Sequence, residues 1–197
     1  MTTILLATHN QDKAKEFQSI FAGIGIDVKT LDAFPQVGPI KEDARTLEGN
    51  ALKKAQEVFR LTGIPSLADD TGLEVRYLND APGVYSSRYA GPGASYAENV
   101  RKLLSALRGV PPRRRAARFR CVLAFVPSGG KYELADGVVN GAILESPRGD
   151  GGFGYDPVFL PNGHAQTYAQ MELETKNLIS HRALAGQKMK EVLQKYL

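Results

Sequence analysis

The chain of 197 residues is 43% hydrophobic and carries a formal charge of +4, which suits one substantial core or two small lobes and weakly favours anionic ligands. Its apolar runs fall short of the roughly 20 residues that a membrane-spanning helix requires. The first expected strand begins almost at Met1, which leaves no room for a signal peptide. With Cys121 as its single cysteine the chain cannot form an internal disulfide, so we expect no membrane partner and a reducing, cytoplasmic location.

The excess of positive charge is concentrated in one arginine-rich stretch. Such a stretch can bind nucleic acid. Arg118 and Arg120, however, alternate with apolar residues in the period-two pattern of a strand with one polar face, and no aromatic platform accompanies them. We therefore expect a solvated loop and strand edge and no nucleic-acid partner, and keep binding of DNA or RNA as a separate hypothesis. The stretch comprises Arg113, Arg114, Arg115, Arg118 and Arg120.

Apolar periodicity and turn chemistry place the elements of the first half of the chain. Thr46 is expected to cap a helix that closes at Gly63, and Gly23 is expected to end the helix before it. The expected elements are a strand at 3–7, a helix entered through 8–13, a strand at 27–31, the helix after Thr46, a buried strand leading to Asp69, and a strand at 73–78.

The second half of the chain continues the mixture of helices and strands. Ser95 and Glu98 form the S-x-x-E capping box of a helix that stops before Pro111. No internal repeat or linker divides the chain, so we predict a single α/β domain over residues 1–197. The later expected elements are strands at 116–126 and 131–138 joined by a hairpin turn at 128–130, a continuation of the sheet at 141–144, a strand at 158–160, and a terminal helix capped by Ser180.

Two adjacent carboxylates, Asp69 and Asp70, follow the buried apolar run. Neighbouring acids repel each other and resist burial, so a cation or hydrogen bonds must compensate them. Open α/β sheets commonly present chemistry at the C-terminal edge of such a strand. Alternatively, the two aspartates only begin a turn before Gly72, because Asp-Thr-Gly is ordinary turn chemistry.

The turn Thr8-x-Asn10-x-x-Lys13 joins the first strand to the first helix. The free N–H groups and positive dipole end of a helix suit phosphate, and these three side chains add donors. The turn lacks the G-x-x-x-x-G-K-[ST] pattern of a Walker A loop. In the alternative interpretation Asn10 is an ordinary N-cap and Lys13 a solvated residue of the first turn.

A glycine-dense loop at 148–157 is the second candidate for ligand binding. Glycine lets the backbone approach a ligand closely, and Phe153 or Tyr155 could stack on a planar ring. The alternation of aromatic residues with glycine before Asp156 favours a site over a plain turn with its aromatic residues in the core.

Cationic donors also precede the terminal helix. Lys176 and the triplet Ser180-His181-Arg182 suit recognition of an anion or a carbonyl oxygen. The three histidines of the chain do not have the spacing of a zinc site. No G-x-S-x-G nucleophile elbow occurs, and Cys121 lies inside an expected strand, so nucleophilic catalysis by serine or cysteine is not indicated.

Five motifs together resemble the Ham1/RdgB family, the inosine/xanthosine triphosphate pyrophosphatases. They occur in family order across the whole chain, which makes the set far more specific than any one of them. The motifs are 8–13 (THNQDK), 68–73 (ADDTGL), 82–89 (PGVYSSRY), 151–157 (GGFGYDP) and 180–182 (SHR).

The resemblance implies an elongated α/β mixed sheet with two lobes flanking a central nucleotide-binding cleft, usually in a homodimer. It implies Mg²⁺-dependent hydrolysis of noncanonical purine nucleoside triphosphates (ITP, dITP, XTP) to the monophosphate and pyrophosphate. Glu42 and Asp70 would hold Mg²⁺, and Asp70 would also be the catalytic base. A nucleotide-binding regulatory protein without catalysis is the alternative. The residues implied to contact the nucleotide are Thr8, His9, Asn10, Gln11, Asp12, Lys13, Thr71, Phe153, Gly154, Tyr155, Asp156, Lys176, His181 and Arg182.

Overall fold

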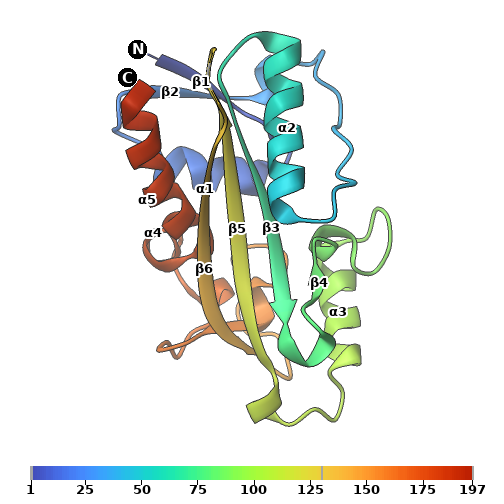
Figure 1. The fold of residues 1–197 in the computed structure, drawn as a ribbon. Coiled ribbons are helices and arrows are strands. Elements are labelled where there is room, and N and C mark those ends of the chain that lie inside the picture. Colours follow the sequence, from blue (N-terminus) through green and yellow to red (C-terminus); the bar gives the residue numbers. More distant parts are fainter. Residues whose placement is uncertain (1, 130, 197) are drawn as a thin grey trace. The chain divides into compact units, whose positions relative to one another are not determined.

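Strands and helices are mixed along the chain in the computed structural model, which describes residues 2–129 and 131–196 (Figure 1). Strand β1 runs parallel to β2 and β3, whereas β4 and β7 run antiparallel to β3 and β6, so the predicted mixed α/β class is confirmed. The strands are β1 (Thr2–Leu6), β2 (Ile26–Thr30), β3 (Ser66–Val75), β4 (Ala81–Gly83), β5 (Ala116–Val126), β6 (Glu133–Ile143) and β7 (Phe159–Pro161). The helices are α1 (Gln11–Ile20), α2 (Leu47–Thr62), α3 (Tyr96–Ala106), α4 (Leu173–Ile179) and α5 (His181–Leu193).

The chain divides into two compact units, each with its own hydrophobic core. Strands β3, β5 and β6 contribute residues to both units, with β5 pairing with β3 and β6. Unit 1 comprises Met1–Asp70, Cys121–Gly137 and His181–Leu197, and unit 2 comprises Thr71–Arg120 and Val138–Ser180.

The core of unit 1 is covered by helices α1 and α5, which lie side by side (Figure 1). Phe17 of α1 and Met189 of α5 are fully buried together with Leu123 of β5. The helices approach closely because α5 carries Gly186, where a Cβ would lie 2.5 Å from Cγ2 of Ile20. This packing brings the last helix of the chain against the first.

The predicted caps of α2 and α3 are confirmed. The Thr46 side chain accepts a hydrogen bond from the Gly49 N–H, and α2 ends at Gly63 with a left-handed φ of 69°. Ser95 and Glu98 form a reciprocal capping box at the start of α3. Local hydrogen-bond chemistry therefore sets these boundaries.

Arg115 of unit 2 is buried, contrary to the expectation that the whole arginine-rich stretch is solvated. Its guanidinium donates hydrogen bonds to backbone carbonyl oxygens after α3 and at the end of β6. Carbonyl oxygens left over at a helix end need such donors, which explains why this arginine is inside. The acceptors belong to Leu107, Val110, Ile143 and Leu144.

Strand β3 continues through both aspartates, so two predictions about them are wrong. Asp69 and Asp70 lie within the strand, neither at its C-terminal edge nor at the start of a turn. Gly72 pairs β3 closely with β4, since a Cβ at Gly72 would lie 2.8 Å from the Gly83 carbonyl oxygen. The glycine that signals a turn in the sequence therefore serves a close approach between strands.

Other boundaries also differ from those predicted. The segments expected at 131–138 and 141–144 form the single strand β6, and β7 starts at residue 159. The expected strand at 73–78 ends at Val75 and continues as a 3₁₀ turn. The short helix α4 was not expected. Gly130, part of the predicted hairpin turn, lies outside the described residues. Among the described helices, none has the length and hydropathy needed to cross a bilayer.

Candidate functional site

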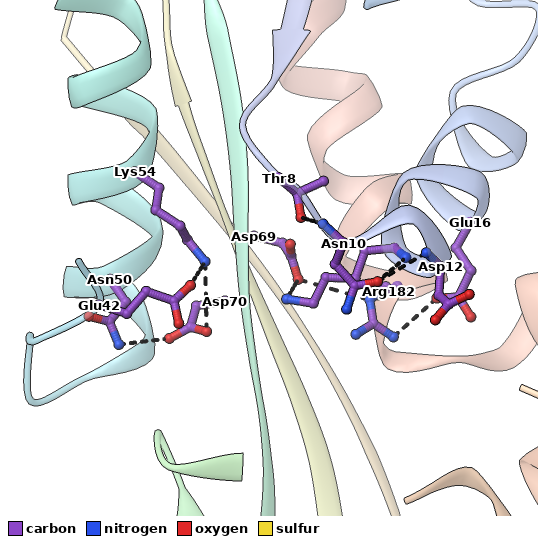
Figure 2. Close-up of polar contacts among 11 residues, drawn as sticks. Thr8, Asn10, Asp12, Glu16, Glu42, Asn50, Lys54, Asp69, Asp70 and Arg182 are labelled. Atoms are coloured by element: carbon purple, nitrogen blue, oxygen red, sulfur yellow. Dashed lines mark hydrogen bonds and ion pairs between the residues drawn. The ribbon is translucent and has the colours of Figure 1, made fainter. Parts of the chain in front are cut away.

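The carboxylate of Asp70 lies on the side of β3 that faces α2 (Figure 2). Asn50 donates a hydrogen bond of 3.0 Å from Nδ2 to Asp70 Oδ2 and accepts one of 2.9 Å at Oδ1 from the Ala44 N–H. One turn further along α2, Lys54 Nζ lies 2.5 Å from Glu42 Oε1 and 3.9 Å from Asp70 Oδ1. Helix α2 thus brings two carboxylates to one ammonium group.

Asp69 points to the opposite side of β3, because successive side chains of a strand alternate (Figure 2). Its carboxylate is fully buried, with Oδ2 at 2.8 Å from Lys13 Nζ and 3.9 Å from Arg182 Nε. Arg182 also donates from Nη1 to Glu16 Oε2 at 3.0 Å. The two adjacent aspartates therefore belong to different charge clusters.

The surroundings shift the pKa values of the two aspartates in opposite directions. Burial opposes ionisation of Asp69, but Lys13, Lys54 and Arg182 together outweigh it and lower its pKa to about 2. Burial, reinforced by the Glu42 carboxylate, raises the pKa of Asp70 despite the nearby lysines. Asp69 is held firmly as an anion, whereas Asp70 is the more basic carboxylate.

The side chains in the turn between β1 and α1 organise the start of the helix. Asn10 Oδ1 accepts hydrogen bonds from the N–H groups of Asp12 and Lys13 at 3.0 and 3.1 Å. Thr8 Oγ1 accepts one from the Asn10 N–H at 3.1 Å. The N-cap interpretation of Asn10 is confirmed, and its side chain already occupies the Asp12 and Lys13 N–H groups at the start of the helix.

The two exposed residues of this turn contact neighbouring loops. Gln11 Nε2 donates to both carboxylate oxygens of Asp32 at 3.0 Å. His9 Nε2 lies 3.5 Å from the Gly38 carbonyl oxygen. Both contacts tie the turn to segments that follow β2.

These two clusters hold four carboxylates and three cationic groups. The excess of one negative charge among these seven groups favours an added positive charge. Magnesium takes one or two protein carboxylates and keeps several waters, so Glu42 and Asp70 fit it. No group of three or more histidine, cysteine or acidic side chains placed for a metal occurs in residues 2–129 and 131–196. The charged residues are Glu16, Glu42, Asp69, Asp70, Lys13, Lys54 and Arg182.

In unit 2, the glycine-dense loop forms a second polar cluster. Lys176 Nζ lies 2.6 Å from Asp156 Oδ2 and 4.9 Å from the centre of the Phe153 ring. Asp156 Oδ2 also accepts a hydrogen bond of 2.9 Å from the Phe153 N–H. Lys176 and Asp156 are buried, while the Phe153 ring is only partly covered. An aromatic face with a fixed cation and anion beside it suits a planar heterocycle.

Tyr155 is not placed to stack on a planar ring. Its ring is buried in the core of unit 2, and its hydroxyl donates a hydrogen bond of 2.9 Å to the Ser86 carbonyl oxygen. Burial raises the pKa of Tyr155 well above its ordinary value. Of the two aromatic residues predicted to stack, Phe153 is the one with an accessible ring.

Replacing Gly152 with alanine is expected to disrupt this cluster. Gly152 has φ of 66°, and a Cβ there would lie 2.2 Å from Asp156 Oδ2, which Lys176 and Phe153 hold in place. We expect a loss of about 2–4 kcal/mol in the free energy of unfolding, measured by urea titration. Gly154→Ala is the matched control, because φ is 63° but nothing lies within 4 Å, and it should lose only about 1 kcal/mol. Equal losses would show that the clash is unimportant.

Sequence reasoning missed three side chains that organise the site. Asn50 and Lys54 are spaced i, i+4 on α2, so they share a face of the helix. This spacing is the sequence pattern that indicates that they act on the same neighbour. Glu16 is buried against Arg182 from far along the chain, and no local pattern indicates that pair. His181, which was predicted, is buried at the start of α5.

In unit 1 a pair of carboxylates suits a divalent cation, and in unit 2 an aromatic, charged loop suits a planar ring. Within a mixed α/β fold, this chemistry is that of a nucleotide-binding protein. Comparison with known sequences gives the particular family. Residues 4–192 match the Ham1 family, and the chain belongs to it.

Relatives with assigned activities are similar over nearly the whole chain. A dITP/XTP pyrophosphatase of Geobacter sulfurreducens is 46% identical over 193 residues, which cover 98% of this chain and 97% of that protein. One of Porphyromonas gingivalis is 47% identical, covering 98% of each. Among solved structures, a HAM1 protein from Coxiella burnetii has a TM-score of 0.89 at 40% identity, covering 99% of this chain and 100% of that one.

Proposed function

We propose that this chain hydrolyses noncanonical purine nucleoside triphosphates (dITP, ITP and XTP) to the nucleoside monophosphate and pyrophosphate. The observation that carries the proposal is the convergence of Glu42 and Asp70 on one side of β3, in a chain 46–47% identical to dITP/XTP pyrophosphatases. The fixed anion Asp69 and its partner Lys13 lie on the other side. The reactive end of the site is thus assigned to unit 1.

In the proposed reaction a water molecule attacks the α-phosphorus, and the bond to the β-phosphate oxygen breaks to release pyrophosphate. Asp70 accepts the proton of the water, which suits the carboxylate with the raised pKa. Asn50 holds Asp70 Oδ2 through its amide and so fixes the carboxylate plane. Lys13, anchored by Asp69, supplies a positive charge for the phosphates.

Glu42 and Asp70 would hold the metal ion, for which we propose Mg²⁺. When bound, the ion would neutralise negative charge that develops on the phosphate oxygens. The remaining residues of the turn after β1 are proposed to contact the triphosphate. These are Thr8, His9, Asn10, Gln11 and Asp12.

Recognition of the base is proposed for unit 2 and the start of α5. Hypoxanthine and xanthine carry an acceptor oxygen at C6 where adenine carries an amino donor. A pocket that offers donors such as Lys176 leaves them unsatisfied against ATP, and unsatisfied buried polar groups discriminate strongly. Phe153 is proposed to stack on the base. The other proposed contacts are Thr71, Gly154, Asp156, His181 and Arg182.

Competition between nucleotides tests this function. Pyrophosphate release with Mg²⁺ is measured for ITP, dITP, XTP, GTP and ATP, and we expect kcat/KM for the first three to exceed that for ATP by at least about a hundredfold. GTP shares the C6 oxygen with ITP, so exclusion of its 2-amino group is expected to depend on pocket shape. Equal kcat/KM for all five nucleotides contradicts the assignment.

The same assay separates the alternative function. A regulatory protein without catalysis would bind nucleotide but release no pyrophosphate.

We propose that the enzyme acts as a homodimer in the cytoplasm, which holds the nucleoside triphosphate pool, and that residues 1–197 form one functional domain. Sedimentation equilibrium tests the dimer.

A further inference from the structure

Lys54 occupies an unusual position for a lysine. Its side chain is only 9% exposed, and its ammonium reaches both carboxylates that are proposed to hold a metal ion. Lysine is almost never this buried unless an anion compensates its charge. Here two carboxylates compensate the charge of Lys54, since its Nζ lies 2.5 Å from Glu42 Oε1 and 3.9 Å from Asp70 Oδ1 (Figure 2).

The geometry of α2 explains why the ammonium lies there. Asn50 and Lys54 are one helical turn apart, so both project from the face of α2 that covers Asp70. Asn50 binds Asp70 Oδ2, and Lys54 lies nearer Oδ1. Glu42 belongs to the segment before α2, and the Asn50 bond to the Ala44 N–H holds that segment in place. Lys54 and Asn50 together therefore gather Glu42 toward Asp70.

We propose that Lys54 is a tethered counter-ion that holds Glu42 and Asp70 together in the metal-free protein and gives up these contacts when a divalent cation binds the same carboxylates. The inference rests on the proposed function for the identity of the metal ligands. Two carboxylates repel each other at short range, so without a cation they would separate. The flexible four-carbon stem of lysine lets the ammonium swing aside once the divalent charge arrives.

The sign of the effect on metal affinity distinguishes this role from others. A positive charge that competes for the same oxygens weakens binding of a divalent cation, so removing the charge strengthens binding. A lysine that acted only on substrate would leave metal affinity in the absence of nucleotide unchanged. A lysine that merely supported the fold would weaken metal binding when removed.

The test is Mg²⁺ binding to nucleotide-free protein, measured by calorimetric titration of Lys54→Met. We expect the Kd for Mg²⁺ to fall by at least about tenfold, because the competing charge is lost. In EDTA, the variant should have a lower Tm than the wild type, and Mg²⁺ should raise its Tm by more. Lys54→Gln, which is neutral but polar, gives the same direction if the methionine variant folds poorly.

Lys53→Met is the matched control. Lys53 is the neighbouring residue on α2 and pairs at 2.5 Å with the exposed Asp43. The Lys53→Met substitution therefore removes the same charge from a surface ion pair. Its Kd for Mg²⁺ should equal that of the wild type. An unchanged or higher Kd in both Lys54 variants overturns the inference. If the wild type releases no pyrophosphate yet Lys54→Met binds Mg²⁺ more tightly, the proposed function fails and the counter-ion role stands.

Discussion

Asp70→Asn is expected to reduce pyrophosphate release from ITP by about a thousandfold, because the variant side chain cannot accept the proton of the attacking water. The amide has nearly the shape of the carboxylate, so the packing against α2 changes little. The substitution also replaces one of the two proposed anionic metal ligands with a neutral amide oxygen. The measurement is kcat for pyrophosphate release at saturating Mg²⁺, with ITP binding followed separately by calorimetry.

Asp43→Asn provides the control for Asp70. Asp43 is also an acid paired with lysines of the same region, at 2.5 Å from Lys53 and 3.3 Å from Lys41, but its side chain is 45% exposed. This substitution should leave kcat unchanged. Turnover of Asp70→Asn at the wild-type rate would show that Asp70 is not the base.

Asp69→Ala is expected to lower the free energy of unfolding by about 3–5 kcal/mol, because it leaves the partly buried Lys13 and the buried Arg182 without their shared anion. Urea titration measures the loss. Asp27→Ala is the matched control, since Asp27 pairs at 3.9 Å with Lys29 at the surface and should cost less than about 1 kcal/mol. A loss of similar size in both variants would contradict the importance of the buried cluster.

The pH dependence of stability follows from the same aspartate. The pKa of Asp69 is lowered from its ordinary value of 3.8 to about 2, so its contribution to stability is complete above the unfolded pKa and disappears as pH falls toward 2. The wild type should therefore lose stability between about pH 4 and pH 2 more steeply than Asp69→Ala does.

Features that depend on near neighbours in the sequence could be predicted. The caps at Asn10, Thr46 and Ser95 are satisfied by N–H groups two or three residues away, and all three are confirmed. The motifs also identified the family, because five short segments in a fixed order are specific even when each is common.

Features that depend on distant residues could not be predicted. Strand β3 does not end at Gly72, because Gly72 lies close to Gly83 of β4, eleven residues later in the chain. Arg115 is buried because carbonyl groups at the end of β6 accept its hydrogen bonds. The different partners of Asp69 and Asp70 depend on the direction of each side chain. Those directions follow only once β3 is known to continue through both residues.

The contacts of Arg182 also bear on how the protein is made. Asp69 and Glu16 are translated early, whereas their shared cation belongs to α5, the last α-helix of unit 1 to leave the ribosome. Until α5 arrives, Ile20 of α1 lacks its close neighbour Gly186, and both acids lack that partner. Unit 1 therefore completes its folding late in synthesis, and nascent chains that stop before α5 are candidates for chaperone binding and proteolysis.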